Sequence, residues 1–210
     1  MAKGDRMHKK YYDARQILGD DFISPSEIAK ARNLIYSKEV LAYLIKTLPS
    51  KDTLLWLVDN EYVLMAGPPS RKSLLGIRDL SMSCSFCKPL SGWYTERKER
   101  FSREGGVSIG WSLLRKNHVK NSTNTMWSEQ LELLSEDEYV PSVSVMAWAI
   151  TTYKEVRNIL LFSDIHVRTA SICSNGNHVD TGVSKGMIVI NGHHDYFEFD
   201  EIGLASGLKH

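Results

Sequence analysis

Histidine and aspartate side chains are concentrated near the end of the chain. One residue separates His178 from Asp180, and His193 and His194 follow Asn191-Gly192. An imidazole can act as an acid, a base or a metal ligand near neutral pH. Adjacent strand residues point to opposite faces, so His193 and His194 would not readily bind one metal ion together. The simpler interpretation is a pair of solvated histidines at a turn.

Two cysteines have the spacing of a zinc site. Cys84 and Cys87 form a Cys-x-x-Cys pair, and Cys173 and His178 could complete a set of four ligands. A single pair is weak support, because an isolated cysteine commonly serves as a small buried apolar residue. We therefore expect no cofactor, with zinc at Cys84 and Cys87 as the alternative.

The sequence contains no familiar catalytic motif. No serine lies in the Gly-x-Ser-x-Gly pattern of a nucleophile elbow, and no glycine-rich loop could hold a phosphate. These observations favour a protein without enzymatic activity, and an enzyme of unrecognised type stays open.

The composition is that of an ordinary globular protein. Hydrophobic residues make up 42% of the 210 residues and charged residues 24%, and the formal net charge is +1. This balance offers no global argument for binding nucleic acid. No apolar run approaches the roughly 18 residues of a membrane span, and the start of the chain lacks a secretory signal. The odd cysteine count fits a reducing compartment, so we expect a cytoplasmic protein, or a component of a phage particle if the gene is viral.

Three helices and a strand are predicted between residues 24 and 66. Ser24-Pro25-Ser26-Glu27 combines a capping box with proline at the first helical position. Ser37 and Ser50 can cap two further helices, and Tyr62-Val63-Leu64-Met65 is typical of a strand. We expect three parts: a polar arm at 1–23, a small helical unit at 24–66 and a β-rich domain at 67–210.

The first two of these helices resemble a helix-turn-helix. In that motif the second helix enters the major groove of DNA. Lys30 and Lys38 are the candidate contacts, so a DNA-binding regulator is our alternative hypothesis. The connection between the helices is long and lacks the usual glycine, and the second helix offers few side chains that read base edges.

The C-terminal part alternates strand-like runs with turn residues. Turns are expected at 174–177 and at Asn191-Gly192, and a helix is expected over 141–157. Strands are expected at 93–94, 110–115, 159–162, 164–172, 186–190 and 196–199. The chain is therefore expected to have an α+β fold, with an N-terminal three-helix unit followed by a mixed β-rich domain.

From about residue 24 onward, the chain resembles an uncharacterised family found in bacteria, their phages and mobile elements, which has no assigned activity. The segments that carry this resemblance include Ala66-Gly67-Pro68-Pro69, Gly92-Trp93-Tyr94, Thr125-Met126-Trp127-Ser128-Glu129-Gln130, Val167-Arg168-Thr169 and Leu204-Ala205-Ser206.

The end of the chain is also similar to C-type-lectin-like domains of the formylglycine-generating type. The order of Arg168, the turn at Gly176 and the closing Ile202-Gly203-Leu204-Ala205 carries this similarity. Leu204-Ala205 stands where those domains have an aromatic residue and an arginine, so the enzyme chemistry of that fold is not expected. Such domains use the loops before the last strand for recognition. This resemblance implies a binding face formed by His178, Asp180, His193, His194, Tyr196 and Phe199.

The function expected from these features is recognition of a protein or glycan partner without catalysis. Aromatic and polar turn residues provide rigid contact area together with adaptable hydrogen bonds. The sequence does not predict the identity of the ligand or the oligomeric state.

Overall fold

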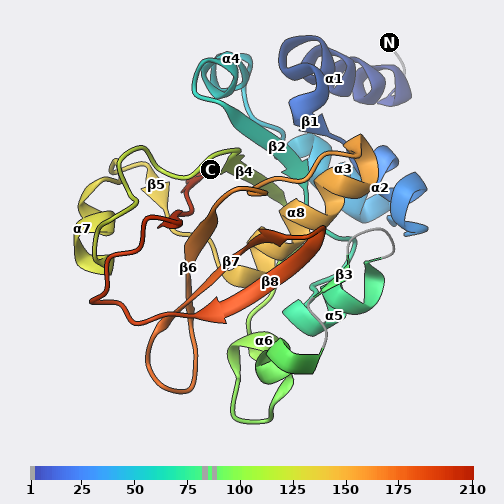
Figure 1. Cartoon of the computed structure of the whole chain (residues 1–210). Coiled ribbons are helices and arrows are strands. Elements are labelled where there is room, and N and C mark those ends of the chain that lie inside the picture. The colour runs from blue at the N-terminus through green and yellow to red at the C-terminus, as the bar shows by residue number, and fades with distance from the viewer. Residues whose placement is uncertain (1–2, 82–84, 87–88) are drawn as a thin grey trace.

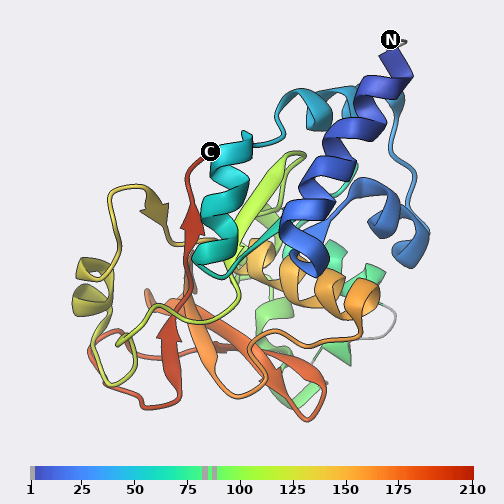
Figure 2. The same ribbon diagram turned by 90° about the horizontal axis from the view of Figure 1, so that it is seen from above.

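Two mixed β-sheets and a central helix organise the chain (Figures 1 and 2). The computed structural model describes residues 3–81, 85–86 and 89–210. Within these residues the first sheet has the strand order β1-β2-β4-β10-β5, and the second has the order β3-β8-β7-β6-β9. The strands of the first sheet are β1 (Phe22–Ile23), β2 (Tyr62–Ala66), β4 (Trp111–Arg115), β5 (Glu138–Tyr139) and β10 (Gly207–Leu208). Those of the second are β3 (Ser85–Phe86), β6 (His166–Ile172), β7 (His178–Ser184), β8 (Met187–Gly192) and β9 (Ile202–Leu204).

Helices precede and separate the strands, so the predicted α+β class is confirmed. The N-terminal helices are α1 (Lys3–Leu18), α2 (Pro25–Arg32), α3 (Lys38–Lys46) and α4 (Lys51–Asp59). The later helices are α5 (Leu74–Leu80), α6 (Phe101–Glu104), α7 (Trp127–Glu132) and α8 (Val143–Arg157), with 3-10 segments at Gly19–Asp21 and Pro89–Thr95. No helix in the described part of the chain is both long and apolar enough to cross a membrane.

The predicted helix starts are confirmed by their caps. The Ser24 amide donates to Glu27 Oε2 at 2.9 Å, and the Glu27 amide donates back to Ser24 Oγ at 3.3 Å. Ser37 and Ser50 accept from the amides of Val40 and Thr53. Each cap satisfies amide groups that the first helical turn leaves without a partner.

Helix α8 lies between the N-terminal helices and strands β6–β8 (Figure 2). Trp148 of α8 is fully buried, and its indole nitrogen donates to the Ala66 carbonyl at the end of β2, at 3.0 Å. Ile28 of α2, Leu44 of α3 and Ile190 of β8 belong to the same hydrophobic cluster. The predicted helical unit and the C-terminal sheet therefore share one core.

Four sequence-based predictions in the C-terminal part are wrong. Trp93 and Tyr94 lie in a 3-10 segment, and residues 159–162 and 196–199 form no strand. Asn191-Gly192 continues β8 instead of forming a turn. The chain reverses at Lys185-Gly186, where φ is 51° and 75°, and this hairpin pairs β8 with β7, a strand that was not predicted.

Glu138 is the main polar junction of the first sheet. Its Oε1 accepts hydrogen bonds from Tyr62 Oη, Arg115 Nε and Ser206 Oγ at 2.6–2.7 Å. Its Oε2 accepts from the amide and hydroxyl of Ser135, both at 3.0 Å. Burial alone would raise the pKa of Glu138, but these hydrogen bonds outweigh it and lower the pKa to about 2.

We predict that Glu138 makes the protein sensitive to acid. A carboxyl group with a folded-state pKa below its ordinary value of 4.5 stabilises the fold above that value, and the contribution is lost as the pH falls toward about 2. The Glu138→Gln variant should lose about 2 kcal/mol of unfolding free energy at pH 7, because hydrogen bonds to a charged acceptor are lost. Its stability should then change less than that of the wild type over this acidic range.

Urea denaturation between pH 2 and 7 measures both effects. The exposed neighbour Glu136 provides the control, since Glu136→Gln should leave the pH profile unchanged. Equal acid sensitivity of wild type and Glu138→Gln would show that this junction does not contribute as described.

Candidate functional site

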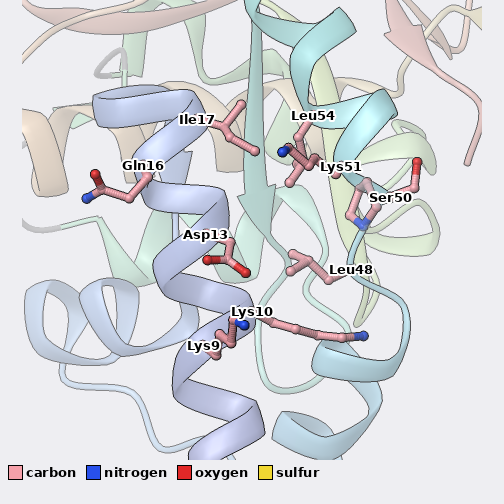
Figure 3. A pocket seen from close by; sticks show the side chains of 10 residues that line it. Lys9, Lys10, Asp13, Gln16, Ile17, Leu48, Ser50, Lys51 and Leu54 are labelled. Carbon is pink, nitrogen blue, oxygen red and sulfur yellow. The ribbon is translucent and has the colours of Figure 1, made fainter.

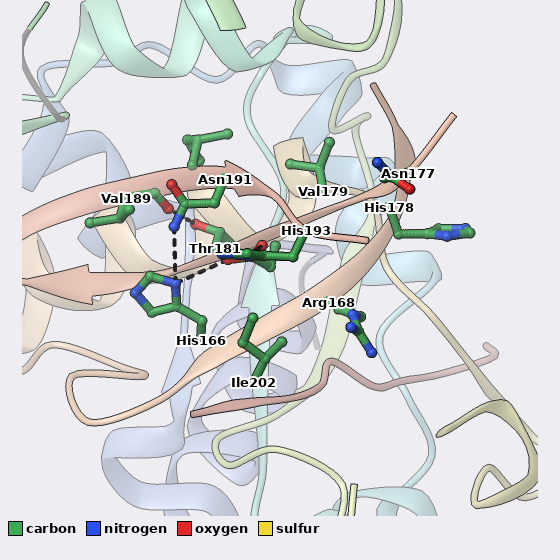
Figure 4. A network of polar contacts seen from close by, with 12 residues as sticks. His166, Arg168, Asn177, His178, Val179, Thr181, Val189, Asn191, His193 and Ile202 are labelled. Carbon is green, nitrogen blue, oxygen red and sulfur yellow. Dashed lines mark hydrogen bonds and ion pairs between the residues drawn. The ribbon is translucent and has the colours of Figure 1, made fainter. Parts of the chain in front are cut away.

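The second sheet has one apolar face and one polar face. Val167, Val179 and Ile190 point toward α8 and belong to the core. Side chains alternate between the two faces along a strand. In the strand register Arg168 of β6 lies opposite Asp180 of β7, and Asp180 lies opposite Asn191 of β8. The opposite face therefore carries the polar residues of three adjacent strands, shown in close-up in Figure 4.

Asp180 is the centre of this polar face. Its side chain is fully buried, its Oδ1 lies 3.0 Å from His166 Nδ1, and its Oδ2 lies 2.6 Å from His193 Nδ1. Burial opposes the charge, yet the hydrogen bonds from the two imidazoles outweigh it and lower the pKa of Asp180. An ionised carboxylate can only accept, so both Nδ1 atoms act as donors. Each imidazole is thus held in one tautomer, with Nε2 free to interact elsewhere.

The two histidines line a polar cavity of about 290 Å³. Asp164, Asn191 and Glu201 also contribute to its wall. In Figure 4 the ring of His166 faces Asn191 with one nitrogen and turns its other nitrogen away. The hydrogen bond that His193 donates to Asp180 raises the pKa of His193, although burial opposes this.

Gly182 makes room for the His166 ring. A Cβ at this position would lie 2.6 Å from His166 Cδ2 and 2.8 Å from the Ile165 carbonyl oxygen. Neither the ring nor the backbone could accommodate that contact without moving. The glycine on β7 therefore helps to determine where the imidazole sits.

Residues 193–200, here called the aromatic loop, cross over the polar face between β8 and β9. Arg168 lies fully buried beneath the loop, and its guanidinium donates to the carbonyls of His194 at 3.2 Å and Phe197 at 2.9 Å. The same group donates to Thr125 O and Gln130 Oε1. Arg168 thus joins the aromatic loop to the segment that leads into α7.

Further contacts hold the aromatic loop from the side. His178 donates its backbone amide and its Nδ1 to the two oxygens of Asp195, at 3.0 and 2.7 Å. The Trp127 amide donates to the Asp195 carbonyl, and the Trp127 ring stacks on His178 with centroids 3.6 Å apart. The loop backbone is therefore fixed at several points, although it forms no regular structure.

The aromatic side chains of the loop differ in their exposure. Tyr196 is 68% exposed and Phe197 55% exposed. His194 is also exposed and stacks on Tyr196. Phe199 is half-buried and packs against the His193 ring and the Arg168 guanidinium.

The six predicted binding residues gather on this side of the second sheet, but they have different environments. Asp180 is buried, His178 donates hydrogen bonds to Asp195 of the loop, and Phe199 packs against His193 and Arg168. His193 reaches the cavity, while His194 and Tyr196 face solvent. Whether these residues bind a ligand remains a prediction.

Arg168 and Phe197 also belong to this site, although they were not among the predicted binding residues. The alternation of polar and apolar residues from His178 to Ser184 was a signal for β7 and would have placed His178 and Asp180 on one face. The support given by Arg168 had no local signal, because its partners are 26 to 43 residues away.

Other candidate sites have less support. Cys84 and Cys87 lie outside the described residues, and Cys173 is a buried thiol that donates to Asn175 Oδ1. Among the described residues, no group of three or more His, Cys, Asp or Glu side chains could hold a metal ion. Lys30 of α2 and Lys38 of α3 are exposed, as DNA contacts would be.

A larger cavity of about 570 Å³ lies between α1 and the start of α4 (Figure 3). Lys9, Lys10 and Lys51 line it together with Asp13 and the apolar Leu48. The polar side chains in its wall are all exposed, so no buried polar group is positioned to bind a ligand or to catalyse a reaction.

Comparison with known proteins found no relative. No protein-family model matches the chain, and neither curated proteins nor solved structures gave a match. The function must therefore be inferred from the geometry of the site.

We predict that Asp180→Asn lowers the pKa of His193, because the carboxylate that raises it is replaced by a neutral amide. The raised His193 pKa stabilises the fold below about 6.5 and the lowered Asp180 pKa stabilises it above about 3.8. Both contributions are complete between these values, and Asp180→Asn should cost about 2 kcal/mol there.

NMR titration of the histidine ring protons and urea denaturation measure the two effects. Asp195→Asn is the matched control, since it removes the carboxylate bound to His178 and should leave the His193 titration in place. An unchanged His193 titration in Asp180→Asn would contradict the assigned hydrogen bond.

Proposed function

We propose that this protein is a non-enzymatic recognition module that binds a protein partner through the aromatic loop. The observation that carries the proposal is the exposure of Tyr196 and Phe197 on a loop whose backbone is fixed by the buried Arg168. We further expect it to act in a reducing compartment such as the cytoplasm.

Exposed aromatic side chains are typical of binding surfaces. Tyrosine and phenylalanine offer large contact areas with few rotatable bonds, so their immobilisation in a complex costs little entropy. The Tyr196 and Phe197 rings meet edge to face with centroids 6.3 Å apart. His194 extends this surface by stacking on Tyr196 with centroids 5.9 Å apart.

The fixed backbone favours a specific interaction. A loop that must become ordered on binding loses affinity, whereas a loop already held in position avoids much of that loss. Arg168 and the 124–127 segment hold the loop through four of its carbonyl groups.

The first test is selection of binders from a random peptide display library, with a glycan array assayed in parallel. Peptides selected on the wild type should bind the His194→Ala/Tyr196→Ala/Phe197→Ala variant at least about 30-fold more weakly, which corresponds to losing about 2 kcal/mol. The melting temperature should change little, because these side chains are exposed. Fluorescence anisotropy measures the affinities.

Leu55→Ala/Val58→Ala on α4 is the matched control, since it removes exposed apolar side chains elsewhere and should leave peptide binding intact. Selected peptides that bind the loop variant as tightly as the wild type would refute the proposal. Loop-dependent binding to glycans alone would assign the same surface to a carbohydrate.

The DNA-binding alternative makes a separate prediction. Binding to random-sequence duplex DNA should weaken steeply with salt, and Lys30→Glu/Lys38→Glu should abolish it. Lys120→Glu/Lys185→Glu, two exposed positions outside α2 and α3, controls for the change of net charge. No binding by the wild type at low salt would end this hypothesis.

A further inference from the structure

The cavity between His166 and His193 is chemically distinct from the aromatic surface beside it. Its polar wall combines imidazoles, carboxylates, hydroxyls and the Asn191 amide, and no lysine or arginine is among its described lining residues. His166, Asn191 and His193 are half-buried, whereas Asp164 and Glu201 are exposed at the rim.

Asp180 determines how the two imidazoles can interact with a ligand. Both Nδ1–H groups are committed to the buried carboxylate, at 3.0 and 2.6 Å. A neutral imidazole with a donor at Nδ1 has a lone pair at Nε2. When both rings are neutral, the pair therefore contributes two acceptors, oriented by a carboxylate that is itself inaccessible to solvent.

The charges around the pair favour a cation. Asp180, Asp164 and Glu201 provide three negative charges around two histidines, and Asp195 lies further along the loop. Arg168 is the positive group near His193, and its guanidinium is directed at the carbonyls of the aromatic loop. An anion would be repelled by these carboxylates, and a neutral polyol would gain no attraction from them.

We propose that this cavity binds the guanidinium group of an arginine side chain from the protein partner. A guanidinium has five N–H donors in one plane and always carries its charge, which matches a wall of acceptors. The partner is then a segment that places apolar side chains on Tyr196 and Phe197 and an arginine between His166 and His193. This inference rests on the proposed function.

The same geometry makes binding dependent on pH. Asp180 raises the pKa of His193, and protonation of His193 converts its Nε2 acceptor into a donor and adds a positive charge beside the bound guanidinium. Affinity should therefore fall as the medium becomes acidic and rise as His193 loses this proton.

The test uses Nα-acetyl-arginine-N-methylamide as the probe and the matching citrulline compound as its uncharged analogue. Histidine ring resonances are followed by NMR in the full chain. The arginine probe should shift His166 and His193 but leave His178, whose Nδ1 is bound to Asp195. The citrulline probe should bind at least about tenfold more weakly, since it lacks the charge.

Two variants and a pH series complete the test. Asp164→Asn and Glu201→Gln change exposed rim residues and should each weaken the arginine probe several-fold without unfolding the chain. Affinity should fall between pH 8 and pH 6, because a proton on His193, whose pKa is raised, competes with the probe. Equal binding of both probes, binding of methyl glucoside instead, or no shift of either histidine would overturn the proposal.

The aromatic-loop variant separates this inference from the proposed function. His194, Tyr196 and Phe197 are not among the cavity's lining residues, so the triple alanine variant should still bind the arginine probe. Loop-dependent peptide binding without probe binding would refute only the arginine pocket. Probe binding with no loop-dependent peptide would refute the proposed function and the partner, and would leave only the cavity's affinity for a guanidinium.

Discussion

The arrangement of the C-terminal side depends on one buried guanidinium. Arg168 is fully buried on the polar face of the second sheet, where an unpaired charge would cost several kcal/mol. Four hydrogen bonds to carbonyl and amide oxygens and the nearby charges of Asp180 and Asp195 reduce that cost, although burial still lowers the pKa of Arg168. Because these oxygens belong to the aromatic loop and to the segment near α7, satisfying Arg168 requires both to close over the sheet.

Asp180 complements Arg168 from the adjacent strand. The two residues are paired in register between β6 and β7, and both are fully buried. Arg168 uses its donors to hold backbone, whereas Asp180 uses its acceptors to hold the side chains of His166 and His193. The sheet thus supports two neighbouring surfaces, an aromatic one on the loop and a polar cavity beside it.

The apolar core and the first sheet lie outside this polar face and are stabilised by more common interactions. Apolar residues of α8, β2 and β6–β8 exclude water in a common core, and Trp148 joins α8 to the end of β2 through one hydrogen bond. In the first sheet, Glu138 of β5 accepts from Tyr62 of β2, from Arg115 of β4 and from Ser206, which directly precedes β10.

Helix starts could be predicted from the sequence, because the residues that mark them are neighbours in the chain. Ser24, Ser37 and Ser50 mark helix starts because a cap joins residues only three positions apart. The aromatic and histidine content of the last residues also pointed to the side of the molecule where the cavity and the aromatic loop lie. Tertiary structure alone decided which of these side chains are exposed: Asp180 and Tyr196 are both polar residues near turns, yet one is buried and the other faces solvent. That outcome depends on Arg168, whose hydrogen-bond partners lie 26 to 43 residues away in the sequence. Long-range partners of this kind leave no pattern in the residues nearby.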